Sequence, residues 1–207
     1  SGLNSGVLHA GIYYEPKSLK AKVCVEGARR LKEWVKERSL SINECGKIII
    51  PQEIHLDAQI DLLYKRGLAN GAKVEILDEV ELNNFLPLCR SSSGRALWSP
   101  NTSVVKPKEV IKRLENELKE KGVVFKLNQY DWKIDPNKRL IYLKNNEKIN
   151  FGHLINCAGL RADEVAHKFD IGKNLKLLPF KGLYWEIKES SKIKINTNLY
   201  PVVLVAS

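Results

Sequence analysis

The spacing of apolar residues divides the chain into helical and strand-like segments. Apolar positions three and four residues apart predict amphipathic helices over residues 18–38, 53–71 and 106–122. Ser18 is suited to cap the first of these helices. Its apolar face is predicted to hold Leu19, Val23, Leu31, Trp34 and Val35. Shorter helices are expected over 79–87 and 161–169.

Strand patterns alternate with these helices. The clearest early strand is the apolar run at 46–51, and shorter strands are expected at 73–78 and on both sides of the Ser99–Thr102 turn. The later segments predicted as strands are 123–129, 131–135, 139–145, 153–159, 176–190 and 198–206. Because these patterns change in blocks along the chain, we expect an α/β protein in which one chain threads two interleaved domains.

Composition narrows the class of protein. The chain has 207 residues, of which 43% are hydrophobic and 28% charged, so a packed core is expected. No apolar run is long enough for a membrane span, and the first residues lack the pattern of a secretory signal, which favours a cytoplasmic protein. The four cysteines lie far apart in sequence, which favours reduced thiols over disulfides or a metal site.

The net charge of +10 does not by itself identify the binding partner. It could attract nucleic acid, phosphates or a dicarboxylate. Lysines are spread along the whole chain among glutamates rather than gathered on one element with aromatic residues, so nucleic-acid binding is not expected. A non-enzymatic basic binding module remains an alternative.

Three stretches contain residues typical of a binding site. The first is NSGVLHAGIYY, residues 4–14, where glycines allow close approach of a ligand and His9 could hold or accept a proton. The second is HLINCAGLRADEVA, where a small-residue turn joins a strand to a helix. The third is LPFKGLYW, where Lys181 could pair with a carboxylate. Taken singly, each also fits a structural role: a buried histidine, a tight turn and a surface lysine.

Together, in this order, these stretches resemble a known family. With CGKIIIP, the SPNT turn and NLYP, they are similar to the L-2-hydroxyglutarate oxidase/dehydrogenase family, FAD-dependent oxidoreductases of the D-amino acid oxidase superfamily. The resemblance implies a partial Rossmann-like FAD domain, residues 1–45 and 106–172, interleaved with a mixed-sheet substrate domain, residues 46–105 and 173–207. It also implies oxidation of the C2 hydroxyl of a 2-hydroxy dicarboxylate, most simply L-2-hydroxyglutarate to 2-oxoglutarate.

The resemblance also assigns roles to residues, with FAD as the cofactor and no metal. His9 and Lys181 are the catalytic candidates: His9 orients the hydroxyl or accepts its proton, and Lys181 binds a carboxylate. Tyr13, Tyr14 and Tyr184 are candidates for the substrate pocket. The cofactor-binding candidates are Asn4, Ser5, Gly6, Val7, Cys157, Ala158 and Gly159. The segments around His9 and Gly159 are expected to converge on the flavin.

Several expectations follow from departures from the family pattern. Relatives carry a GxGxxG turn before the NSG stretch and continue beyond the YP near residue 201, so we expect these residues to be an incomplete portion of the enzyme and inactive alone. Lys106 and Pro107 stand where an acidic and an aromatic residue are common. Oxygen and a quinone remain alternatives as the electron acceptor, and a quinone would imply that the protein associates with a membrane. A homo-oligomer is expected from an unpaired sheet edge. An amine or amino-acid oxidase of the same superfamily is the alternative activity.

Overall fold

The computed structural model describes residues 4–180, 188, 190–192 and 195–203. They form two compact units, each described here by itself. Unit 1 comprises residues 1–122 and 191–207, and unit 2 comprises residues 123–190. The domain boundaries expected from the family resemblance concern the complete two-domain fold and stay a prediction.

The helices of unit 1 follow the predicted pattern closely. They are α1 (Leu19–Glu37), α2 (Asp57–Ala69), α3 (Glu79–Phe85) and α4 (Pro107–Glu120), with a 3-10 turn at Ile54–Leu56 before α2. The Ser18 hydroxyl accepts a hydrogen bond from the Ala21 amide, as expected of a helix cap. A local capping signal therefore accounts for where α1 begins.

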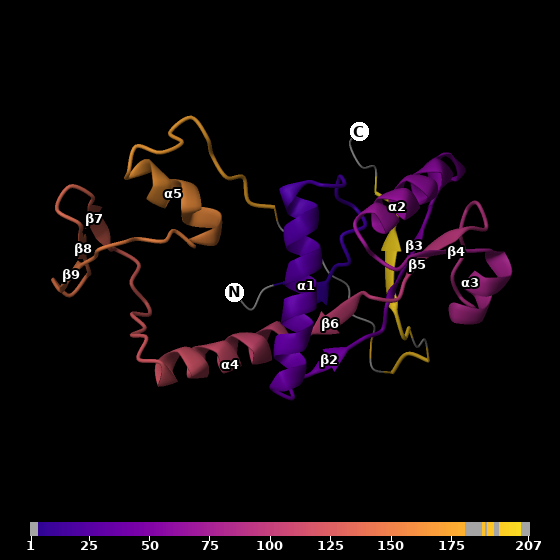
Figure 1. The fold of residues 1–207 in the computed structure, drawn as a ribbon, viewed down its shortest axis with the longest axis horizontal. Coiled ribbons are helices and arrows are strands. Elements are labelled where there is room, and N and C mark those ends of the chain that lie inside the picture. Colours follow the sequence, from indigo (N-terminus) through magenta and orange to yellow (C-terminus); the bar gives the residue numbers. More distant parts are fainter. Residues whose placement is uncertain (1–3, 181–187, 189, 193–194, 204–207) are drawn as a thin grey trace. The chain divides into compact units, whose positions relative to one another are not determined.

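A four-stranded mixed sheet forms the centre of unit 1. Its strands are ordered β10 (Asn198–Pro201), β3 (Lys47–Ile50), β5 (Ala96–Ser99) and β4 (Glu75–Leu77). Strand β10, the yellow arrow in Figure 1, runs parallel to β3, and the other neighbours are antiparallel. In this register Asn198 and Ser99 both lie opposite Lys47. The strand predicted at 46–51 is confirmed, and its neighbour comes from the far end of the chain.

A smaller antiparallel sheet completes unit 1. It is ordered β1 (Val7–Leu8), β6 (Ser103–Val105) and β2 (Ile42–Asn43). Leu8 lies opposite Ser103, so the NSG stretch enters the fold through this sheet. The residue after β1 is His9.

Apolar residues pack on both faces of the central sheet. On one face the buried side chains include Ile12, Ile49, Ile60 and Leu63. On the other they include Ile48, Leu77, Leu82, Leu86 and Ala96. Alternation along β3 places Lys47 on the same face as Ile49. A lysine therefore lies on the face that packs against α2 and the loop containing Ile12.

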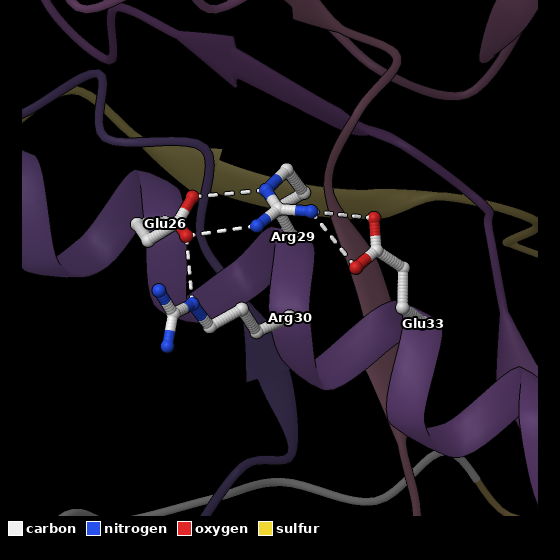
Figure 2. A network of polar contacts seen from close by, with 4 residues as sticks. All are labelled: Glu26, Arg29, Arg30 and Glu33. Carbon is white, nitrogen blue, oxygen red and sulfur yellow. Dashed lines mark hydrogen bonds and ion pairs between the residues drawn. The ribbon is translucent and has the colours of Figure 1, made fainter.

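The predicted apolar face of α1 is only partly correct. Val35 is fully buried, but Leu19 and Val23 are 76% and 60% exposed, because nothing in the described structure packs against the first turns of the helix. The exposed surface of α1 also carries a network in which Glu26 pairs with Arg29 and Arg30, and Arg29 pairs with Glu33 (Figure 2). These exposed pairs stabilise a solvated helix surface modestly.

Unit 2 is built from a small antiparallel sheet and one short helix. Its strands are β7 (Lys133–Asp135), β8 (Leu140–Tyr142) and β9 (Lys148–Asn150), in that order. The helix is α5 (Ala162–His167), preceded by a 3-10 turn at Gly159–Arg161. The predicted strands at 131–135 and 139–145 are confirmed, while β9 was not predicted.

Two predicted strands are wrong for the described structure. Residues 123–129 and 153–159 form no strand, and no described strand pairs with either segment. Val124 and Ile155 are 77% and 86% exposed. A strand needs hydrogen bonds from a neighbouring strand, and here the apolar pattern has none to pair with. The strand expected at 176–190 is absent from its described residues 176–180, 188 and 190, and the remainder lies outside the described residues.

Candidate functional site

A group of polar and aromatic side chains is enclosed in unit 1. It consists of His9, Tyr13, Lys47 and Tyr200, and we call it the His9 cluster. The ring of His9 meets the rings of Tyr13 and Tyr200 edge-on, at centroid distances of 6.4 and 6.0 Å. The Lys47 ammonium lies over the same two tyrosine rings, 4.4 Å from the centroid of Tyr13 and 5.2 Å from that of Tyr200. Four side chains from three separate segments of the chain therefore lie together.

The loop that carries the cluster is held by α2. The Asn70 amide donates hydrogen bonds to the carbonyls of Gly11 and Tyr14, both at 2.9 Å. The guanidinium of Arg66 pairs with Glu15 at 2.7 Å and reaches the Tyr13 carbonyl at 3.4 Å. These contacts fix the backbone of the turn, and the orientation of Tyr13 follows from them.

Burial and charge keep His9 neutral. Burial, and then the positive charge of Lys47, lower the pKa of His9 from 6.5 to about 4. Its Nδ1 atom is buried and has no hydrogen-bond partner among the described residues. A neutral imidazole with an unpartnered nitrogen is available at pH 7 for a hydrogen bond with a ligand hydroxyl.

Burial changes the other titratable groups of the cluster in the expected directions. The pKa of Lys47 is lowered from 10.5 to about 8, chiefly by burial. The pKa of Tyr13 is raised, first by burial and then by Tyr200. Nearby, the Cys24 thiol of α1 donates to the His9 carbonyl at 3.3 Å. At pH 7 the cluster thus combines a cationic lysine, a neutral histidine and a protonated Tyr13.

The cofactor-binding candidates in unit 1 form the turn before β1, except Val7, which is the first residue of that strand. The Asn4 side chain accepts from the Gly6 amide at 2.9 Å, and Ser5 accepts from the Val7 amide at 3.4 Å. Gly6 has φ +72°, and a Cβ there would stand 2.1 Å from the Val105 carbonyl oxygen. Glycine is therefore required at this position by close packing against the end of β6.

The cofactor-binding candidates in unit 2 form an exposed turn. The Asn156 side chain accepts from the Ala158 amide at 3.2 Å, and Cys157, Ala158 and Gly159 are all exposed. Gly159 has φ +59°, and a Cβ there would meet no atom within 4 Å. The turn leads into the 3-10 helix rather than directly into α5.

The predicted site residues fall into three groups. His9 and Tyr13 belong to the His9 cluster, whereas Tyr14 has its described ring contact with Lys20, at 5.8 Å. Cys157, Ala158 and Gly159 belong to the other unit, so their convergence with His9 remains a prediction. Lys181 and Tyr184 lie outside the described residues.

Sequence reasoning missed Lys47 and Tyr200. The GKIII run is typical of a strand that begins with a solvated lysine, yet Lys47 is 0% exposed. The available signal is that CGKIIIP and NLYP, which contain these two residues, both belong to the stretches that carry the family resemblance. Pairing between β3 and β10 explains both residues, since it brings Tyr200 beside Ile49.

The described residues fit a flavin in two respects. His9 offers an unpartnered, neutral imidazole. The Gly159 turn exposes backbone that no neighbouring side chain covers, which suits close approach of a ligand. Among the described residues, no group of three or more histidine, cysteine or acidic side chains could hold a metal ion.

Comparison with known proteins defines the class. Residues 1–206 match the family described as FAD dependent oxidoreductase, so the chain belongs to that family. The fold agrees: L-α-glycerophosphate oxidase from Mycoplasma pneumoniae superimposes with a TM-score of 0.72 at 19% identity, covering 97% of this chain and 54% of that one. Glycine oxidase from Geobacillus kaustophilus gives 0.66 at 16% identity, covering 82% and 48%.

The curated relatives are more specific. The chain is 34% identical to the mitochondrial L-2-hydroxyglutarate dehydrogenase of Caenorhabditis elegans, over 98% of this chain and 48% of the relative. It is 31% identical to the enzyme of the same name from Homo sapiens, over 98% and 46%. The chain therefore spans about half the length of the curated relatives it matches.

The relatives' names also bear on location. They place those enzymes in mitochondria, and the expectation of a cytoplasmic protein stays a prediction. No helix among the described residues combines the length and apolar composition needed to cross a bilayer.

Proposed function

We propose that the protein carrying these residues oxidises the C2 hydroxyl of a 2-hydroxy dicarboxylate with FAD as cofactor, the substrate being L-2-hydroxyglutarate and the product 2-oxoglutarate. The observation that carries this proposal is the similarity of 98% of the chain to L-2-hydroxyglutarate dehydrogenases at 31–34% identity. The chemistry of the His9 cluster supports it independently, because it combines a proton acceptor with a buried cation.

His9 is the residue proposed to handle the proton of the substrate hydroxyl. Alcohol oxidation removes a proton from oxygen and a hydride from carbon, and FAD when bound supplies the hydride acceptor. A base must be unprotonated to take the proton, and the pKa of His9, lowered to about 4, keeps the imidazole neutral at pH 7. The adjacent Lys47 charge disfavours the imidazolium further.

Tyr13 and Tyr200 are proposed to orient the substrate beside His9. Both rings contact the imidazole, and burial raises the pKa of Tyr13, so its hydroxyl stays protonated. The predicted contact of Lys181 with a substrate carboxylate is kept as part of the proposal. Asn4, Ser5, Gly6 and Val7, with Cys157, Ala158 and Gly159, are proposed to lie along the cofactor.

The test is turnover by the full product of the gene that encodes these residues. We expect a flavin absorbance band and formation of 2-oxoglutarate from L-2-hydroxyglutarate with an artificial electron acceptor. His9→Gln should lower kcat by about 100-fold or more while the flavin band is retained. The matched control His153→Gln, at an exposed position, should leave kcat unchanged.

Two outcomes would contradict the proposal. Turnover of glycine, sarcosine or another amine without turnover of 2-hydroxy acids would favour the amine-oxidase alternative. A colourless protein that FAD does not restore would exclude flavin chemistry.

Oxygen consumption during turnover would separate oxygen from a quinone as the electron acceptor.

A further inference from the structure

Among the described residues, Lys47 is a buried cation without a counter-ion. Its side chain is 0% exposed, and its Nζ atom has no hydrogen-bond partner in the described structure. None of the ion pairs among the described residues includes Lys47. Besides burial, which lowers the pKa of Lys47, the one influence on that pKa comes from Cys24, which raises it. An isolated buried ammonium is strongly unfavourable, and contact with two tyrosine rings offsets only about 2 kcal/mol of that.

The position of Lys47 connects this missing charge to the His9 cluster. Its ammonium and the His9 imidazole contact the same two rings, those of Tyr13 and Tyr200. These three covering side chains are only partly buried, whereas Lys47 is completely buried. Lys47 therefore lies deeper in the fold than His9, Tyr13 and Tyr200.

Serine and threonine side chains add to the polar character of this end of the sheet. Ser99 lies opposite Lys47 on β5 and is fully buried, with its hydroxyl 3.3 Å from that of Thr102. The buried Ser103 hydroxyl, opposite Leu8, has no partner among the described residues. Uncharged donors can support a bound anion but cannot neutralise Lys47, which leaves the charge to the ligand.

We propose that Lys47 binds the substrate carboxylate farther from the reacting carbon, which makes it the residue that selects 2-hydroxy dicarboxylates over 2-hydroxy monocarboxylates. This inference rests on the proposed function. The carboxylate next to C2 is held close to the hydroxyl that His9 receives, whereas the end of the substrate chain can reach the more deeply buried ammonium. The incoming carboxylate supplies the counter-charge that the described residues lack, in a setting where charged hydrogen bonds are strong.

The experiment compares two substrates that differ only at that end. L-2-hydroxyglutarate ends in a carboxylate, and L-2-hydroxypentanoate has a methyl group in its place. Lys47→Met should lower kcat/KM for L-2-hydroxyglutarate by about 10- to 100-fold and leave L-2-hydroxypentanoate within about 3-fold, as expected for loss of one charged hydrogen bond. Lys148→Met is the matched control, because Lys148 also lies over a tyrosine ring, Tyr142 at 5.9 Å, in the other unit. Lys148→Met should leave kcat/KM unchanged for both substrates.

Equal loss for both substrates, or no loss for either, would overturn the proposal. A second measurement separates it from the proposed function. Glutarate, which cannot be oxidised at C2, should bind the wild-type protein and shift the Lys47 Nζ resonance in NMR, whereas pentanoate should not. If neither hydroxy acid is oxidised but glutarate still shifts Lys47, the proposed function fails and the carboxylate site stands. If glutarate leaves the Lys47 Nζ resonance unchanged, the proposed carboxylate site is wrong. This outcome depends neither on the activity nor on whether Lys47→Met folds.

Discussion

At the scale of residues, Lys47 presents a conflict between stability and function. Its buried ammonium has no hydrogen-bond or ion-pair partner among the described residues, so it destabilises the fold without a ligand. A side chain of similar length and no charge would pack against the same rings without that penalty. The lysine is therefore explained better by a ligand than by folding.

This explanation predicts the stability of a variant. Lys47→Met should raise the free energy of unfolding by about 1–3 kcal/mol at pH 7, because an unpaired buried charge is replaced by an apolar side chain. Urea denaturation with a folded-state check by circular dichroism would measure it. Lys148→Met, at a lysine with an exposed side chain, should stay within about 0.5 kcal/mol of wild type. A loss of stability in Lys47→Met would show that the ammonium has a stabilising partner.

The titration of His9 gives a second prediction. Its imidazole should titrate by NMR near pH 4 rather than 6.5, and Lys47→Met should raise that pKa because one positive charge is removed. Between these two pH values the unfolded chain binds a proton that the folded chain does not. The contribution of His9 to stability is therefore complete above about pH 6.5 and falls as the pH is lowered toward 4. An unchanged His9 pKa in Lys47→Met would show that the charge of Lys47 does not act on His9, and would contradict the prediction.

At the scale of elements, sequence patterns identify what is locally encoded. Ser18, Pro107 and the glycine after α4 mark helix ends by chemistry that needs no partner, and all three ends match the structure. Residues 123–129 and 153–159 have an equally good strand pattern, but a strand depends on a neighbour that the pattern does not contain. The burial of Lys47 was unpredictable for the same reason, since it depends on β10 at the other end of the chain.

The turn before β1 yields a prediction at this scale. Gly6→Ala should lower the free energy of unfolding by more than about 3 kcal/mol, because an alanine there has both positive φ and a clash with the Val105 carbonyl. Gly122→Ala, just after α4, has positive φ of +81° but open space, and should lose only about 1–2 kcal/mol. Thermal denaturation of both variants would measure the difference. Equal losses would mean that the turn can shift away from β6.

At the scale of the whole molecule, the described structure exposes many large apolar side chains. In unit 2 Ile155 and Phe180 are 86% and 91% exposed, and in unit 1 Leu88 is 77% exposed. Apolar surface of this extent is typical of a face that meets other protein. The net charge of +10 opposes association at low ionic strength.

The 207-residue chain should therefore self-associate more strongly as salt is raised. Light scattering against concentration at low and high ionic strength would measure this. Ile155→Lys should weaken the association by adding a charge to the apolar surface, and Asn137→Lys, which adds the same charge at an exposed polar position, should have less effect. A monomer at all concentrations and ionic strengths would contradict both this prediction and the expected homo-oligomer.

The pairing of β10 with β3 has a consequence for biosynthesis. Asn198 and Gly46, which are hydrogen-bonded, stand 152 positions apart, so the ribosome makes β3 about 8 to 30 s before its parallel neighbour at ordinary translation speeds. Through that interval Lys47 stays hydrated and Tyr200 does not yet exist. All of unit 2 is synthesised in between, so the amino-terminal unit reaches its final form only after the later one has left the exit tunnel.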